Sequence, residues 1–146
     1  MQEKLSRRAA SKRYYDRPLL KNYANKTILI VDDEKEIREL IRETLTIDDF
    51  HVLEANSGEQ ALQLVSQENP DLVLLDVAMP GSYDGIEVSR RIKTNTRTQQ
   101  ISVIFLTAVP LDDFQDRQVF ADDVFYKPFS PIKLVNRIHA ILDRAD

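Results

Sequence analysis

The chain has 146 residues, 42% hydrophobic and 30% charged, so it is long enough to fold as one domain and does not have the composition of a disordered or membrane-embedded protein. It contains no cysteine, which excludes disulfides, thiolate zinc sites and cysteine nucleophiles. The net charge of −4 is unevenly distributed, because residues 1–26 carry +6 and residues 27–146 carry −10, and this division predicts a basic N-terminal arm over 1–26 ahead of an acidic domain over 27–144.

After Lys26 the pattern alternates between strand and helix. Continuous apolar runs predict strands at 27–31, 50–54, 71–75, 101–106 and 124–126. Apolar residues at helical spacing predict about five helices, over 33–45, 57–69, 85–93, a short stretch within 110–122, and 130–142. This alternation predicts an α/β fold, a doubly wound parallel sheet of five strands with helices on both faces.

Polar residues stand where the predicted strands end. Asp32 and Asp33 follow the first strand, Asp76 the third, Thr107 the fourth and Lys127 the fifth. In a doubly wound sheet the carboxyl ends of the strands line the ligand site, so we expect these side chains at one edge. The chain has three glycines and neither a G-x-G-x-x-G nor a P-loop motif, so nucleotide binding of those kinds has no support.

The expected site has the chemistry of phosphoryl transfer. Three clustered carboxylates repel one another, and a divalent cation with oxygen ligands, Mg²⁺, relieves that repulsion. Asp76 on the central strand is the expected nucleophile and forms an acyl phosphate. Mg²⁺ and the Lys127 ammonium then compensate the negative charge of the phosphoryl oxygens, and the Thr107 hydroxyl donates a hydrogen bond to one of them.

Each of these residues also has a simpler interpretation when taken alone. Asp33, with Glu36 three residues later, fits a helix cap. Asp76 fits the opening of a loop, Thr107 an ordinary strand end, and Lys127 a solvated turn residue. Only the joint pattern of four strand ends favours the site.

The same residues resemble the receiver domain of two-component response regulators. The matching stretches are ILIVDDE (28–34), PDLVLLDVAMP (70–80), DG (84–85), VIFLTA (103–108) and KPFSP (127–131). The resemblance implies a flavodoxin-like strand order of 2-1-3-4-5. It implies Asp76 as phosphoacceptor, with Thr107 and Lys127 contacting the phosphoryl group. It also implies Asp33, Asp76 and the backbone carbonyl of Ala78 as Mg²⁺ ligands, with Asp32 acting through water.

Several positions depart from the family pattern. Val124 stands three residues before Lys127, where the family usually has an aromatic ring that follows the threonine inward. The loop between Met79-Pro80 and Asp84-Gly85 is longer than the commonest form, and the segment between Thr107 and Lys127 is short. Ala78 and Val109 are apolar and cannot orient an attacking water, which predicts slow autodephosphorylation.

The resemblance implies a phosphohistidine donor on a sensor histidine kinase or a phosphotransfer protein. We expect a cytoplasmic phosphoacceptor that docks a downstream protein target or passes the phosphoryl group onward. It is not expected to be an enzyme beyond its own phosphorylation and slow hydrolysis. No membrane segment, no secretory signal and no DNA-binding output domain are expected, and a homodimer is left open.

Two other functions remain as alternatives. The first is a receiver-fold interaction module with weakened or absent phosphate switching, for which Val124 is the main argument. The second is a haloacid-dehalogenase-type phosphatase, which Ala78 disfavours because that family has a second aspartate there. For the basic arm over 1–26 three interpretations stay open: a solvated tail, an arm packed on its own domain or a partner, and an arm that binds nucleic acid or another acidic surface.

Overall fold

The structure is a computed structural model that describes residues 23–114 and 117–145. Its centre is one parallel sheet of five strands in the order β2-β1-β3-β4-β5. The strands are β1 (Thr27–Val31), β2 (His51–Ala55), β3 (Leu72–Asp76), β4 (Ser102–Thr107) and β5 (Asp123–Tyr126). Both the predicted doubly wound sheet and its strand order are confirmed.

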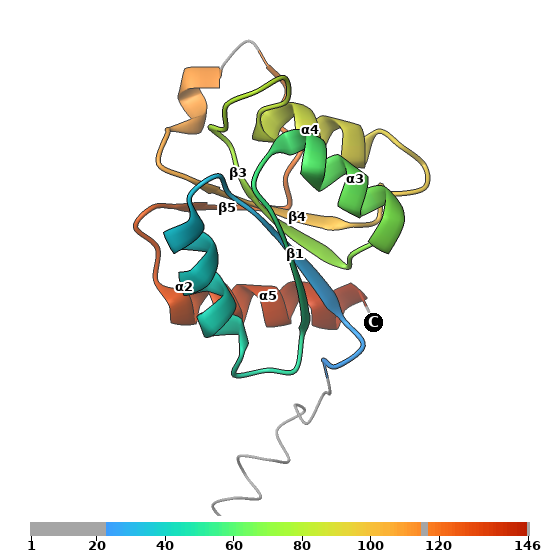
Figure 1. Cartoon of the computed structure of the whole chain (residues 1–146), viewed down its shortest axis with the longest axis vertical. Helices are drawn as coiled ribbons and strands as arrows, with labels where there is room; N and C mark the ends of the chain where they lie inside the picture. Colours follow the sequence, from blue (N-terminus) through green and yellow to red (C-terminus); the bar gives the residue numbers. More distant parts are fainter. Residues whose placement is uncertain (1–22, 115–116, 146) are drawn as a thin grey trace, which may run out of the picture.

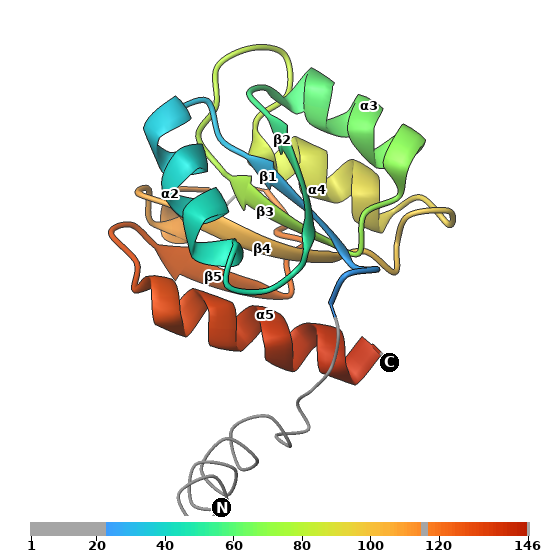
Figure 2. The ribbon, with the colours of Figure 1, turned by 60° about the horizontal axis from the view of Figure 1, so that its bottom comes forward.

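Four α-helices cover the two faces of this sheet in the described part of the chain. They are α2 (Lys35–Leu45), α3 (Gly58–Glu68), α4 (Gly85–Lys93) and α5 (Pro131–Ala145). Helices α2 and α5 lie on one face, and α3 and α4 lie on the other (Figures 1 and 2). Each face therefore buries its own hydrophobic core, one around Phe105 and one around Ile104.

Burial decreases from the centre of the sheet toward β5. Every residue of β3 is buried, as expected for a continuous apolar run between two helical layers. In β5 no residue is fully buried, and Tyr126 is exposed. The strand that carries the expected nucleophile is thus the most enclosed, and the strand before Lys127 is among the least.

The helix starts show which of the predicted caps form. The Ser57 hydroxyl accepts a hydrogen bond from the Gln60 amide at 3.2 Å, and α3 begins after it as predicted. The Ser130 hydroxyl accepts from the Lys133 amide at 3.3 Å, ahead of α5. The cap expected at Asp33 is wrong, because the N-cap of α2 is Glu34, which makes no side-chain cap bond.

In its described residues, 108–114 and 117–122, the connection between β4 and β5 contains less helix than expected. These residues form one 3₁₀ turn, η1 (Leu111–Phe114), and no α-helix. The carboxylate of Asp122 ties the end of this connection to the domain: it accepts a hydrogen bond from the Val103 amide at 2.7 Å and pairs with Lys93 at 2.8 Å. These bonds fix the chain against β4 and α4 just before β5 begins.

The chain enters the sheet from beside α5. The Tyr23 ring stacks on His139 with centroids 4.8 Å apart, and its hydroxyl donates to Asp143 at 3.0 Å. The same ring contacts Phe50, and only 9% of Tyr23 is exposed. The rest of the predicted arm, residues 1–22, lies outside the described residues.

None of the helices described here is long and apolar enough to span a membrane.

Candidate functional site

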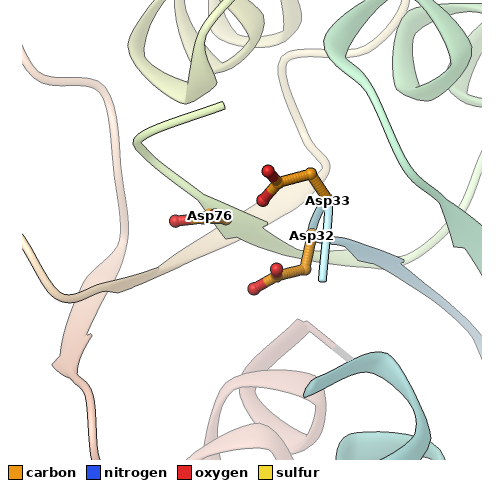
Figure 3. A group of neighbouring side chains, drawn as sticks. All are labelled: Asp32, Asp33 and Asp76. Carbon is orange, nitrogen blue, oxygen red and sulfur yellow. The ribbon is translucent and has the colours of Figure 1, made fainter. Parts of the chain in front are cut away.

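Three carboxylates converge at the carboxyl ends of β1 and β3. The two strands are paired so that Val31 lies beside Leu75, and the residues after them, Asp32 and Asp76, are therefore neighbours. Asp32, Asp33 and Asp76 each offer an oxygen, and these oxygens all lie within 4.8 Å of one another. Figure 3 shows the three side chains extending to the same side of the strand ends. The expected acidic cluster is thus present.

A close backbone contact holds the loop after Asp76 in place. The first residue of α4, Gly85, donates its amide to the Val77 carbonyl at 2.8 Å. A Cβ atom at Gly85 would lie 2.2 Å from the Asp76 carbonyl oxygen, so only glycine allows this approach. Asp84 caps the helix by accepting from the Glu87 amide at 2.9 Å, and a bidentate pair with Arg117 holds Asp84 in turn.

Lys127 brings a positive charge to the carboxylates. The peptide bond between Lys127 and Pro128 is cis, and the Lys127 amide donates to the Thr107 carbonyl at 2.9 Å. The side-chain ammonium donates to Asp32 at 2.8 Å and lies 3.8 Å from Asp76. Burial alone lowers the pKa of Lys127, but the hydrogen bond and the charge of Asp32 reverse this, so its pKa is raised and the ammonium stays charged.

Burial and like charge raise the pKa of Asp76 to about 7. Burial contributes most, and the negative charge of Asp32 adds to it. The Lys127 charge and the hydrogen bond from the Ala78 amide act in the opposite direction, whereas Asp33 raises the pKa slightly further. The single positive charge of Lys127 therefore does not fully compensate the negative charge of the three carboxylates. Oxygen donors with excess negative charge are what Mg²⁺ prefers, so the residues present fit that ion.

The three aspartates differ in how many hydrogen bonds their carboxylate oxygens accept. Asp32 is 1% exposed, and it accepts from the Glu34 amide at 2.8 Å as well as from Lys127. Asp33 is exposed, and within residues 23–114 and 117–145 its carboxylate makes no hydrogen bond or ion pair. This difference suits a direct contact of a metal with Asp33 and an indirect one with Asp32, which stays a prediction.

Thr107 is buried at the end of β4, on the same edge of the sheet. Its hydroxyl donates to the Val109 carbonyl at 3.0 Å and accepts from the Val109 amide at 2.9 Å. Both hydrogen bonds stay within the loop that follows β4. The expected contact of Thr107 with a phosphoryl group therefore stays a prediction, as does metal ligation by the Ala78 carbonyl.

Val124 occupies the position where the family has an aromatic ring, and it lies on the face of the sheet covered by α3 and α4. Val124 is half-buried there and pairs in register with Phe105. Two residues on, Tyr126 is the register partner of Thr107 and is 51% exposed. An aromatic residue is thus the register partner of Thr107, but it stands at a different position of β5 from the aromatic residue of the family pattern.

Sequence reasoning missed Arg38, which lies on the first turns of α2. Its Nη1 donates to the Asp32 carbonyl at 2.8 Å, and its Nε donates to Glu54 on β2 at 3.0 Å. The helical pattern places Arg38 outside the apolar stripe, but nothing in that pattern reveals its contacts with Asp32 at the end of β1 and Glu54 on β2.

Comparisons with known proteins agree with this geometry. A family model described as the response regulator receiver domain matches residues 28–139. The phosphate regulon transcriptional regulatory protein PhoB of Pseudomonas aeruginosa is 46% identical over 121 residues, which is 82% of this chain and 52% of that protein. The transcriptional regulatory protein ResD of Bacillus subtilis is 42% identical over 81% of this chain and 48% of its own.

Solved structures give the same result. The response regulator protein TrrA from Thermotoga maritima, in complex with Mg(2+)-BeF, superposes with a TM-score of 0.70 at 34% identity. The match covers 80% of this chain and 98% of that one. A response regulator from Chloroflexus aurantiacus superposes with a TM-score of 0.72 at 32% identity, over 81% and 98% of the two chains. The chain spans about half the length of the curated relatives it matches.

Proposed function

Because the chain belongs to the response regulator receiver domain family, we propose that it accepts a phosphoryl group on Asp76 in a site completed by Mg²⁺. The observation that carries the proposal is the convergence of Asp32, Asp33 and Asp76 within 4.8 Å, with the Lys127 ammonium beside them. The TrrA structure, in complex with Mg(2+)-BeF, supports the choice of ion.

The proposed reaction moves a phosphoryl group from a phosphohistidine to the Asp76 carboxylate. An oxygen of Asp76 forms the new bond to phosphorus as the bond from phosphorus to the histidine nitrogen breaks, and the nitrogen keeps that electron pair. Lys127, already 3.8 Å from Asp76, contacts one phosphoryl oxygen, and the Thr107 hydroxyl contacts another. To do so, the hydroxyl exchanges its bond to the Val109 carbonyl for one to the phosphoryl group.

Asp33, Asp76 and the Ala78 carbonyl would hold the metal, with Asp32 acting through water. When bound, Mg²⁺ neutralises charge on the carboxylates and on the phosphoryl oxygens. The nucleophile must be ionised to react, and positive charge beside Asp76 counteracts the raised pKa of that group. Arg38 and Lys127 both donate hydrogen bonds to Asp32, Arg38 to its backbone carbonyl and Lys127 to its carboxylate.

We propose a sensor histidine kinase or a phosphotransfer protein as the donor of the phosphoryl group. The phosphorylated domain would signal by docking a downstream protein or by passing the group onward, within the cytoplasm. Apart from its own phosphorylation and slow hydrolysis, no enzymatic activity is proposed. The division into a basic segment over 1–26 and a receiver domain over 27–144 is part of the same proposal.

One observation favours a second candidate, an interaction module with weakened phosphate switching. Val124 offers no ring to move toward Thr107, and the Thr107 hydroxyl is already satisfied by Val109. In this case the acidic cluster would persist while phosphorylation of Asp76 would be weak or absent.

Intact-mass measurement tests these candidates. The full chain is incubated with Mg²⁺ and a small phosphodonor such as acetyl phosphate. We expect one alkali-labile phosphoryl adduct, absent in Asp76→Asn and much reduced in Asp33→Asn, which keeps the nucleophile and loses a metal ligand. No adduct on the wild type would favour the interaction module, and turnover of the donor without an adduct would favour a phosphatase.

A further inference from the structure

We infer that Arg38 is a positioning residue, which fixes the turn of Asp32 and Asp33 in the orientation that binds Mg²⁺. The inference rests on the proposed function, because it assigns a role in the same metal site. Arg38 is not among the residues proposed to hold the metal or the phosphoryl group, and its contacts connect three elements of the fold.

The Arg38 guanidinium connects α2, β2 and the end of β1. One nitrogen donates to the Asp32 carbonyl at 2.8 Å, and another donates to the Glu54 carboxylate at 3.0 Å. Glu54 lies on β2, directly beside Ile30 of β1 in the register of the sheet. The Arg38 side chain is only 15% exposed, so this bridge is largely shielded from water and from screening by salt.

These contacts hold the two peptide groups that flank the Cα atom of Asp32. Its amide donates to the Ala55 carbonyl at 3.2 Å, and its carbonyl accepts from Arg38. Because a peptide group is planar, holding the Asp32 carbonyl also fixes the amide of Asp33 and the direction in which Asp33 leaves the chain. The Asp33 carboxylate is exposed and makes no bond of its own in the described part of the chain, so the backbone is what orients it.

The chain offers a matched control one helical turn later. Arg42 donates to the other oxygen of Glu54 at 2.6 Å, and its second contact is the Val52 carbonyl at 3.3 Å. Together the two arginines lower the pKa of Glu54 in spite of its burial, so this carboxylate stays charged. Arg38 and Arg42 thus share one partner, but only Arg38 reaches Asp32.

The direction in which the Mg²⁺ affinity changes distinguishes a positioning role of Arg38 from a purely electrostatic one. Arg38 carries a positive charge near a cation site, so its removal should strengthen Mg²⁺ binding if charge alone mattered. If Arg38 positions the turn, its removal weakens binding instead. Residues that support metal ligands in this way change metal affinity by about tenfold or more when they are substituted.

The test measures Mg²⁺ affinity by titration calorimetry on the full chain, for the wild type, Arg38→Met and Arg42→Met. We expect the Kd to rise about tenfold in Arg38→Met and to stay within about twofold of the wild type in Arg42→Met. Urea unfolding without metal checks that both variants are folded. If Arg38→Met does not fold, Arg38→Lys replaces it, since a lysine keeps the charge but cannot hold Asp32 and Glu54 in the same fork geometry.

A second measurement needs no metal. The ¹⁵N order parameters of Asp33 and Glu34 should fall in Arg38→Met and stay unchanged in Arg42→Met. Equal Mg²⁺ affinities or equal order parameters in the two variants would overturn the inference and leave the proposed function intact, provided that the wild type binds Mg²⁺ and is phosphorylated. A wild type that neither binds Mg²⁺ nor forms the adduct would overturn the proposed function, and the inference with it.

Discussion

The ammonium of Lys127 and the carboxylate of Asp32 form an ion pair 2.8 Å long, although 95 residues separate them in the chain. The carboxylate is 1% exposed and the lysine side chain 14%. The pair joins the ends of β1 and β5, which are not neighbours in the sheet. It also brings Lys127 within 3.8 Å of Asp76, where the proposed chemistry takes place.

Removal of Lys127 should destabilise the metal-free protein strongly. In Lys127→Met a buried carboxylate loses its partner, and we expect the free energy of unfolding at neutral pH to fall by about 3 kcal/mol. Lys35→Met is the control, because the pair of Lys35 with Glu39 is exposed and 3.9 Å long; its loss should cost about 0.5 kcal/mol or less. Urea unfolding measures both. Saturating Mg²⁺ should recover part of the loss in Lys127→Met only, and similar losses in the two variants would contradict the prediction.

Stability should depend on pH through Asp76. Its pKa in the folded protein is about 7, above its ordinary value of 3.8, so the folded state binds the proton more tightly than the unfolded one. The stabilisation is therefore complete below pH 3.8 and is lost as the pH rises to about 7, with a slope of at most about 1.4 kcal/mol per pH unit. Asp76→Asn should lack this contribution.

Unfolding free energies of the wild type and Asp76→Asn, measured without metal from pH 4 to 8, test this directly. The difference between the two curves should change across the window, and parallel curves would argue against the raised pKa. The same proton competes with the metal, so the Kd of the wild type for Mg²⁺ should fall as the pH rises through 7.

Gly85 should tolerate no larger side chain. In Gly85→Ala the new Cβ would lie 2.2 Å from the Asp76 carbonyl oxygen and 2.7 Å from the Val77 Cα, which are backbone atoms that cannot move aside without displacing the loop. We expect a loss of roughly 3 kcal/mol and a reduced yield of the phosphoryl adduct. Gly81→Ala is the control: its φ of +104° makes alanine unfavourable by about 1 kcal/mol, but its nearest neighbour is the Glu59 carboxylate at 3.5 Å. That variant should keep the adduct yield of the wild type.

The phosphoryl adduct should hydrolyse slowly. Ala78 is exposed and Val109 is half-buried, and neither side chain can bind and orient an attacking water. After the donor is removed in the presence of Mg²⁺, the adduct should persist for minutes or longer by intact mass. Ala78→Asn supplies a polar group at this position and should shorten the lifetime by about tenfold, whereas Ala78→Val should not. A wild-type half-life of only seconds would be incompatible with this account.

The sequence predicts the fold well where one physical signal dominates. The buried strand before Asp76 is a continuous apolar run, and few other structures bury such a run on both sides. The strand ends then place Asp32, Asp33 and Asp76 together because parallel strands share an edge.

Where weak local preferences compete, the sequence is less informative. Asp33 suits a helix cap better than Glu34 does, but α2 begins after Glu34, whose amide donates to the Asp32 carboxylate. Where a short helix is expected within 110–122, the described residues form one 3₁₀ turn, and the contact of Asp122 with the Val103 amide fixes the end of this connection. The bond between Asp122 and Val103 joins residues 19 positions apart and leaves no local pattern. The bond from Arg38 to the Asp32 carbonyl spans six positions, but it connects a helix to a strand end and is not part of the helical pattern.

The decrease in burial from β3 to β5 sets how firmly each site residue is held. Amide protons of β3 lie under helices on both sides and should exchange with solvent only through global unfolding, while those of β5 can exchange through local opening at the edge of the sheet. Asp76 ends the most protected strand and Lys127 follows one of the least protected. The proposed nucleophile is therefore held at the centre of the sheet, and the lysine that accompanies it follows an edge strand that opens at a lower free energy than the centre does.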